Sequence, residues 1–200
     1  VIVCGAGPAG VSAAISAART GARTRLIEVH GCLGGVWTAG LLSNIIDSGN
    51  KTGLMPEILL RLRQTGSQID AVRYDAECMK SLLEKMCVEA GVKVLLHTRV
   101  VAAYKDNANR LTTIVTENKS GREAWRGKIF VDTTGDGDLA ALAGCRFDLG
   151  HPVTGKMQPM TLMALLMGVD YPALHERRLI RGDGISSTVP APKGISPEES

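Results

Sequence analysis

The chain opens on short apolar runs separated by small residues. Residues 1–4 form a β-branched run that stops at glycine, and residues 9–19 are alanine-rich and end before Gly21, a residue type that commonly terminates helices. Residues 23–28 then alternate toward a second strand. The pattern predicts strand, tight turn, helix and strand. This is a βαβ unit, whose strands are parallel and whose crossover is right-handed.

Two further helices are predicted from apolar residues at helical spacing. Residues 30–53 contain too much glycine for a regular element and are predicted to form an ordered, functional loop. A helix over about 55–64 follows the loop. Asp75 is placed to cap the next helix, whose apolar residues recur at i, i+3, i+4 and i+7 across 79–90 while its charged residues face away. Gly91 ends that helix.

The middle of the chain predicts strands. They cover residues 92–97, 99–105, 111–117 and 123–131, and the last three are separated by turn sequences at 106–109 and 119–121. The first of the four is of the buried type. The other three predict an antiparallel meander joined to a parallel sheet, which makes the fold α/β.

The pattern weakens after the last strand. Residues 134–138 read Thr-Gly-Asp-Gly-Asp and lead into a short apolar helix that ends at Ala143, with Gly144 as its terminator. From Cys145 onward no clear periodicity remains. We therefore expect a domain over 1–150, followed by the start of an incomplete region over 151–200.

Composition narrows the classes of function. The 200 residues are 44% hydrophobic, which suits about one folded domain. A net charge of +3 spread along the chain and an aromatic content of 4% argue against a nucleic-acid partner. The longest apolar stretch, 160–169, has about ten residues where a bilayer span needs roughly 20, so no membrane partner is expected either.

The spacing of the cysteines indicates whether the chain is expected to hold a redox-active cysteine pair or to bind a metal ion. The five cysteines form no Cys-x-x-Cys pair and no cluster with zinc spacing. We therefore expect reduced thiols, a cytoplasmic location and no metal site. Cys32 lacks a second cysteine within several residues, so a dithiol relay is not expected and Cys32 is interpreted as a packing residue.

One motif in the βαβ unit indicates a binding function. Residues 5–10 read Gly-x-Gly-x-x-Gly after a strand and at the start of a helix, the context that makes this motif informative. Gly5 permits the tight turn, Gly7 lets a pyrophosphate approach the backbone, and Gly10 lets helix and strand pack closely. Glu28 at the end of the second strand is placed to accept ribose hydroxyls, and its charge disfavours NADP. The alternative is that the glycines serve packing alone.

These residues, with Gly34-Gly35 and the sequence Asp-Thr-Thr-Gly-Asp-Gly-Asp at 132–138, resemble the FAD-dependent oxidoreductase family of the glutathione-reductase type. The resemblance covers roughly residues 1–170. It implies a Rossmann-like parallel sheet with an inserted antiparallel three-stranded meander, an FAD/NAD(P)-binding domain. It also implies that FAD is the cofactor, with Glu28 on the adenosine ribose and the Gly-Gly loop along the pyrophosphate.

The resemblance implies a set of cofactor-binding residues. Val100 is included by position as a backbone contact to adenine, and Thr38 as a candidate for flavin N5 or O4, whereas Trp37 is expected to pack. Asp136 and Asp138 would bind cofactor, order water or cap the following helix. The complete set is Gly5, Gly7, Pro8, Ala9, Gly10, Glu28, Val29, Gly34, Gly35, Thr38, Val100, Thr134, Gly135 and Asp136.

The expected reaction is hydride transfer from a small-molecule substrate to flavin N5. Two alternatives stay open: a dinucleotide-handling enzyme without flavin redox chemistry, similar to the thiazole synthases, and a non-catalytic dinucleotide-binding fragment. No catalytic residue is assigned, although His151 and Gln158 are preferred for testing because they follow the last cofactor motif. The pattern carries no signal for oligomeric state.

The resemblance also predicts that the chain is a fragment. Family members have a later Gly-Asp strand end that contacts the cofactor, and after residue 150 the only candidate is Arg181-Gly182-Asp183-Gly184, which no convincing apolar strand precedes. We therefore expect the natural chain to extend beyond both ends, and the fragment to be inactive alone.

Overall fold

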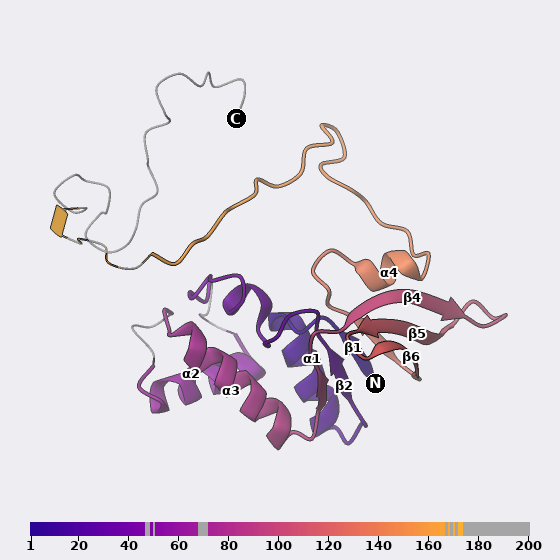
Figure 1. Cartoon of the computed structure of the whole chain (residues 1–200), viewed down its shortest axis with the longest axis horizontal. Helices are drawn as coiled ribbons and strands as arrows, with labels where there is room; N and C mark the ends of the chain where they lie inside the picture. The colour runs from indigo at the N-terminus through magenta and orange to yellow at the C-terminus, as the bar shows by residue number, and fades with distance from the viewer. Residues whose placement is uncertain are drawn as a thin grey trace. The chain divides into compact units, whose positions relative to one another are not determined.

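A computed structural model describes residues 1–46, 49, 51–67, 72–166, 168, 170 and 172–173. The chain divides into two units, Val1–Met163 and Ala164–Ser200. The regular elements discussed below all belong to the first unit (Figure 1). The Arg181-Gly184 candidate lies outside the described residues, and the predicted boundary near residue 150 stays a prediction.

A four-stranded parallel sheet is the centre of the first unit. Its order is β3-β2-β1-β7, and every neighbouring pair is parallel. The strands are β1 (Ile2–Cys4), β2 (Arg25–Ile27), β3 (Lys93–Leu95) and β7 (Phe130–Asp132). Helix α1 (Pro8–Arg19) connects β1 to β2, so the predicted βαβ unit is confirmed. The strand predicted over 92–97 is a short edge strand, and Lys93 on it is exposed.

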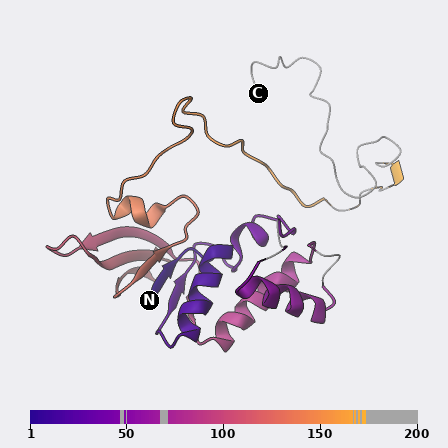
Figure 2. The same ribbon diagram turned by 180° about the vertical axis from the view of Figure 1, so that it is seen from behind.

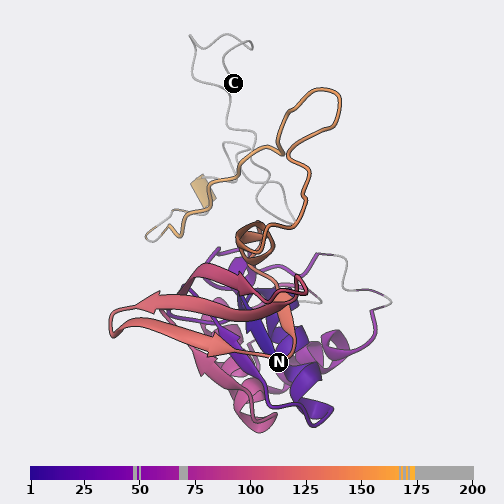
Figure 3. The same cartoon turned by 90° about the vertical axis from the view of Figure 1, so that its right-hand side faces the viewer.

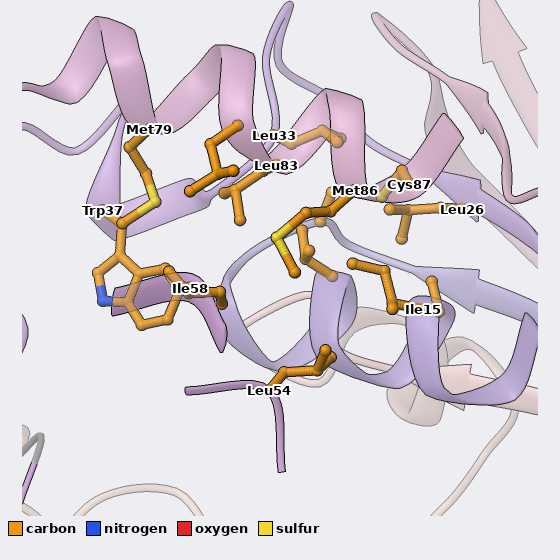
Figure 4. Packing of buried hydrophobic residues seen from close by; sticks show 14 of the residues in the cluster. Ile15, Leu26, Leu33, Trp37, Leu54, Ile58, Met79, Leu83, Met86 and Cys87 are labelled. Carbon is orange, nitrogen blue, oxygen red and sulfur yellow. The ribbon is translucent and has the colours of Figure 1, made fainter. Parts of the chain in front are cut away.

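Helices form the layer on one face of the sheet (Figures 1 and 2). They are α1, α2 (Leu54–Gln64) and α3 (Ala76–Glu89), of which the last two confirm predicted helices. As predicted, Asp75 caps α3 by accepting a hydrogen bond from the Cys78 backbone N–H at 2.9 Å. The apolar faces of these helices and of the sheet make the main core (Figure 4).

Alternation along β1 sends its side chains into two separate cores. Val3 belongs to the main core with the helices, whereas Ile2 and Cys4 belong to a second cluster that includes Ile114 of the meander and Leu139. Successive side chains of a strand point to opposite faces of a sheet. The parallel sheet is therefore covered by helices on one face and by the meander on the other.

The meander forms its own antiparallel sheet of order β4-β5-β6 (Figure 3). Its strands are β4 (Arg99–Lys105), β5 (Leu111–Asn118) and β6 (Gly121–Arg126). The prediction of one strand over 123–131 is wrong, because β6 and β7 belong to different sheets. The chain changes sheet at Gly127, where a Cβ atom would lie within 3.1 Å of Phe130 and Ile2. Helix α4 (Asp138–Leu142) then follows β7 as predicted.

The five cysteines are free, and their environments differ. Burial, with Asp132 nearby, raises the pKa of Cys4 to about 12, and burial raises the pKa of Cys87 to about 11. Cys145 is exposed.

Because the thiolate is the reactive form, we expect iodoacetamide at pH 8 to label Cys145 at least ~100-fold faster than Cys4 or Cys87 in the folded protein. Peptide mass spectrometry over a time course measures this, and comparable rates at all three sites would contradict the burial of Cys4 in β1 and of Cys87 in α3.

No helix among the described residues is both long enough and apolar enough to cross a bilayer.

Candidate functional site

A cavity of about 330 Å³ lies at the carboxyl ends of β1, β2 and β7. This is the edge of a parallel α/β sheet at which ligands bind. The chain runs from β1 to β2 on one side and returns to β7 on the other, so the cavity lies where the strand order reverses. It is lined by Gly5, Gly7, Pro8, Ala9, Ile27, Glu28, Val29, His30, Gly35, Val36, Thr98, Arg99, Val100, Thr133, Thr134, Gly135 and Asp138.

The three motif glycines have different surroundings. A Cβ atom on Gly10 would overlap the carbonyl oxygen of Gly5 and lie 2.7 Å from Oγ1 of Thr133. A Cβ atom on Gly5, whose φ is +95°, would overlap the Thr133 carbonyl. A Cβ atom on Gly7 would meet nothing within 4 Å. Gly5 and Gly10 are therefore needed for packing, whereas at Gly7 the open space belongs to the cavity.

Gly7 is also the N-cap of α1, and no side chain caps this helix. The first N–H groups of a helix lack partners within it, and with the helix dipole they favour an anion. Pro8 occupies the first turn, where its missing N–H costs nothing. The amino end of α1 thus faces the cavity with bare backbone and positive electrostatic character.

Glu28 is a buried carboxylate attached to the same turn. It is only 4% exposed, and its Oε2 accepts a hydrogen bond from the Ala6 backbone N–H. Its Oε1 accepts a hydrogen bond from the His30 backbone N–H at 2.8 Å. A carboxylate offers about four acceptor positions, of which these bonds use two. Glu28 therefore stabilises the turn and keeps acceptor capacity for a ligand in the cavity.

The opposite wall is built by the end of β7. Oδ1 of Asp132 accepts hydrogen bonds from the Thr134 backbone N–H at 3.0 Å and from the Thr134 hydroxyl at 2.7 Å. Oδ2 of Asp132 accepts from the Ala140 N–H at 2.7 Å. The capping role considered for Asp136 and Asp138 is thus performed by Asp132, and the N-cap residue of α4, Gly137, provides no side-chain cap.

The glycine pair closes the third side. The Gly34 N–H donates to the Ala6 carbonyl at 2.7 Å, which joins the pair directly to the motif turn. Gly35 lies so close to Gly7 that a Cβ atom on it would be 2.9 Å from the Gly7 Cα. Only residues without a side chain permit this approach of two backbones.

Behind the pair, Thr38 and Trp37 point into protein. Thr38 is fully buried, and its hydroxyl donates to the Leu33 carbonyl. The structure therefore does not bring Thr38 to the cavity, in contrast to the expectation of a flavin contact. Trp37 is 8% exposed and belongs to the main core, which confirms its packing role. The Tyr74 hydroxyl donates to the Trp37 carbonyl at 3.0 Å and so fastens the loop.

The structure brings most of the predicted cofactor-binding residues together. Ten of them line the cavity: Gly5, Gly7, Pro8, Ala9, Glu28, Val29, Gly35, Val100, Thr134 and Gly135. Gly10 and Gly34 support the cavity from behind, and Thr38 and Asp136 do not line it. His151 lies in an exposed turn, where its Nδ1 accepts from the backbone N–H groups of Val153 and Thr154, and Gln158 is also exposed.

Several lining residues were not predicted as site residues. They are Ile27, His30, Val36, Thr98, Arg99 and Thr133. All six adjoin or lie within predicted elements or motifs, so adjacency along the chain was an available signal for them. For Thr133, which lies inside the 132–138 motif, the sequence did not reveal its partner. Its hydroxyl lies 2.7 Å from the carbonyl oxygen of Gly5, a residue 128 positions away.

Comparison with known proteins adds two kinds of similarity. A family model described as FAD dependent oxidoreductase matches residues 1–199. Among curated proteins, no match was found. Solved structures share the fold, and they include a triple mutant of the flavin-dependent brominase Bmp2, with a TM-score of 0.57 and 15% identity over 72% of this chain and 41% of that one.

Two other structures have similar scores. THI4 from Thermovibrio ammonificans matches with a TM-score of 0.51 and 20% identity, over 70% of this chain and 59% of that one. L-proline dehydrogenase from P. horikoshii matches with a TM-score of 0.53 and 15% identity, over 74% of this chain and 56% of that one. The chain thus spans 41% to 59% of the lengths of these three structures.

Proposed function

Because the chain belongs to the FAD-dependent oxidoreductase family, we propose that its cavity holds the ADP half of FAD and that the whole protein oxidises a small-molecule substrate. The observation that carries the proposal is the open space over Gly7 at the uncapped amino end of α1, beside the buried carboxylate of Glu28. Five free cysteines support a cytoplasmic location as part of the same proposal.

The residues present fit the ADP half of FAD. A diphosphate needs close backbone approach and N–H donors, and Gly7 with the first turn of α1 offers both. A ribose needs an acceptor for its hydroxyls, and Glu28 has one to offer. Val29 and Val100 also line the cavity, and we expect the adenine to lie against them. The cavity volume, about 330 Å³, is at the low end of the roughly 300–1,000 Å³ of ligand sites, which suits part of a dinucleotide.

In the proposed reaction, the residues of this chain bind FAD and orient it. When bound, FAD would supply hydride acceptance at flavin N5. The amino end of α1 would neutralise part of the diphosphate charge, and Glu28 would set the position of the ribose. Asp132 holds the Thr134 segment against α4, which keeps the β7 wall of the cavity in place. Together these residues would bind the ADP half of FAD and fix its orientation in the cavity.

The reaction is tested on the full-length protein. We expect it to purify with bound flavin, and we expect one member of a panel of alcohols, amines and hydroxy acids to bleach the visible flavin absorbance under anaerobic conditions. Purification without flavin would contradict the proposed cofactor site. Retained flavin that no substrate reduces would contradict hydride transfer and favour the dinucleotide-handling alternative.

The role of Glu28 is tested with nucleotide fragments. The Glu28→Gln variant keeps the side-chain shape but replaces one acceptor oxygen by an amide donor, so we expect about tenfold weaker ADP binding. The wild type should prefer ADP over 2′-deoxy-ADP, and the variant should lose that preference. Isothermal titration calorimetry measures both affinities, and Glu123→Gln on the exposed side of β6 is the matched control. An unchanged preference in the Glu28 variant would contradict ribose binding by this carboxylate.

A further inference from the structure

A second cavity, of about 850 Å³, lies at the amino ends of the parallel strands and is strongly basic. Its lining contains Arg23, Arg25, Lys93, Arg126 and Lys128 and no acidic residue. It includes residues of β1, β2, β3 and β6, and Figures 1 and 3 show the meander beside the amino terminus. The cavity of about 330 Å³ that is proposed to hold the ADP half of FAD lies at the opposite ends of the same strands, so the two sites are separate.

The five cations have no acidic partners among the described residues. Other cationic side chains of the chain do form ion pairs, for example Arg19 with Glu57 and Arg61 with Glu89. None of the five lining cations is in such a pair. The five cations therefore form a local concentration of positive charge that no acidic residue of the lining offsets.

Two of these cations are neighbours within the sheet. Arg25 on β2 is in register with Lys93 on β3, so their side chains leave the same face of adjacent strands. Strands in a sheet are about 4.8 Å apart, so the two side chains start from neighbouring backbone positions, where like charges are unfavourable. An anion between the two side chains would convert this repulsion into attraction.

The Arg25 side chain is held in place before any ligand arrives. Its guanidinium carbon lies 3.7 Å from the ring centroid of Trp125 on β6, a cation–π contact. A guanidinium held in this way loses less conformational freedom on binding, and its planar set of N–H donors matches the oxygens of a phosphate group. Val1 also lines the cavity, and its amino group donates to the Arg23 carbonyl at 2.8 Å.

We propose that this cavity is a binding site for a multivalent phosphate-type anion, distinct from the dinucleotide site. Five cations around one open cavity suit a ligand with several negative charges better than a single monovalent ion. Since the cations are solvent-exposed or half-buried, the attraction is screened by salt, and the affinity falls as ionic strength rises. The ligand also stabilises the fold, because it removes repulsion that only the folded chain creates.

Inorganic tripolyphosphate is the probe for the test. We titrate it into the FAD-loaded full-length protein at constant ionic strength, by calorimetry and by tryptophan fluorescence. We expect binding at least ~10-fold tighter than that of orthophosphate, a rise in the melting temperature, and a fluorescence change that Trp125→Phe removes. Trp37 is a poor reporter because it is buried in the core.

Variants that each remove one positive charge distinguish binding at this site from nonspecific attraction of the anion to the protein. Arg25→Gln and Lys93→Gln should each weaken tripolyphosphate binding at least ~5-fold, whereas Lys119→Gln in the β5–β6 turn, which removes the same charge elsewhere, should not. Absence of binding, equal loss in all three variants, or displacement of tripolyphosphate by FAD would each overturn the proposal. Because the melting temperature is recorded for every variant, a loss caused by unfolding is recognised directly.

Discussion

The Gly7→Val substitution is expected to raise the Kd for FAD at least ~100-fold while the melting temperature stays within about 2 °C of the wild type. A Cβ atom at this position would meet nothing within 4 Å outside its chain neighbours, so we expect the fold to accommodate the two methyl groups that valine adds. That room is the cavity over the amino end of α1, and a diphosphate cannot occupy it together with a valine side chain. The same change therefore leaves folding intact and removes binding.

The measurement combines a fluorescence titration of apo-protein with FAD and a thermal melt. Gly7→Ala, which adds a single carbon, should give an intermediate loss of affinity. Ala141→Val on the exposed side of α4 is the matched control and should change neither quantity. If Gly7→Val retained wild-type affinity, the diphosphate would bind elsewhere and the proposed cofactor site would be wrong.

Gly10→Ala, in contrast to Gly7→Val, is expected to destabilise the fold, with a loss of about 3 kcal/mol in the free energy of unfolding. In a helix interior, alanine ordinarily stabilises by about 1 kcal/mol relative to glycine. Here the added Cβ would overlap the Gly5 carbonyl oxygen, which is backbone and cannot move without opening the turn. The clash outweighs the gain in helix propensity, so the sign of the effect is reversed.

For a chain of this length, that loss lowers the melting temperature by roughly 6–12 °C. Urea denaturation gives the free energy itself, and it shows whether the slope of unfolding has stayed constant. Ser16→Ala on the exposed face of the same helix is the control and should be neutral or slightly stabilising. A Gly10→Ala variant as stable as the wild type would show that α1 and β1 do not pack as closely as described.

The motif predicted different roles for these two glycines: Gly7 permits the approach of a ligand, and Gly10 permits close packing of helix and strand. Its spacing places Gly7 at the start of a helix and Gly10 one turn later, and both consequences follow from local geometry. The capping of α3 by Asp75 and its apolar periodicity were predictable for the same reason. In each case the partner atoms lie within a few residues along the chain.

Other expectations differ from the structure at places where packing of the chain decided the outcome. One continuous strand was predicted over 123–131, but the chain changes sheet at Gly127 because Phe130 and Ile2 pack against it. Thr38 was expected at the flavin, but it turns toward the Leu33 carbonyl in a loop fastened by Tyr74. Capping of α4 was one of three roles considered for Asp136 and Asp138; in the structure, Thr134 and Asp132 accept hydrogen bonds from its first N–H groups.

The sequence by itself determined the order of helices and strands, the motif turn and the family, since periodicity and glycine spacing are local properties of the chain. Only the tertiary structure decided which residues surround the cavity. Glu28 reaches Ala6 across 22 positions, and Thr133 reaches Cys4 across 129. It also decided that five cations from separate parts of the chain, none in an ion pair with a described residue, gather at the opposite end of the sheet. Such contacts depend on the packing of whole elements, which no local pattern specifies.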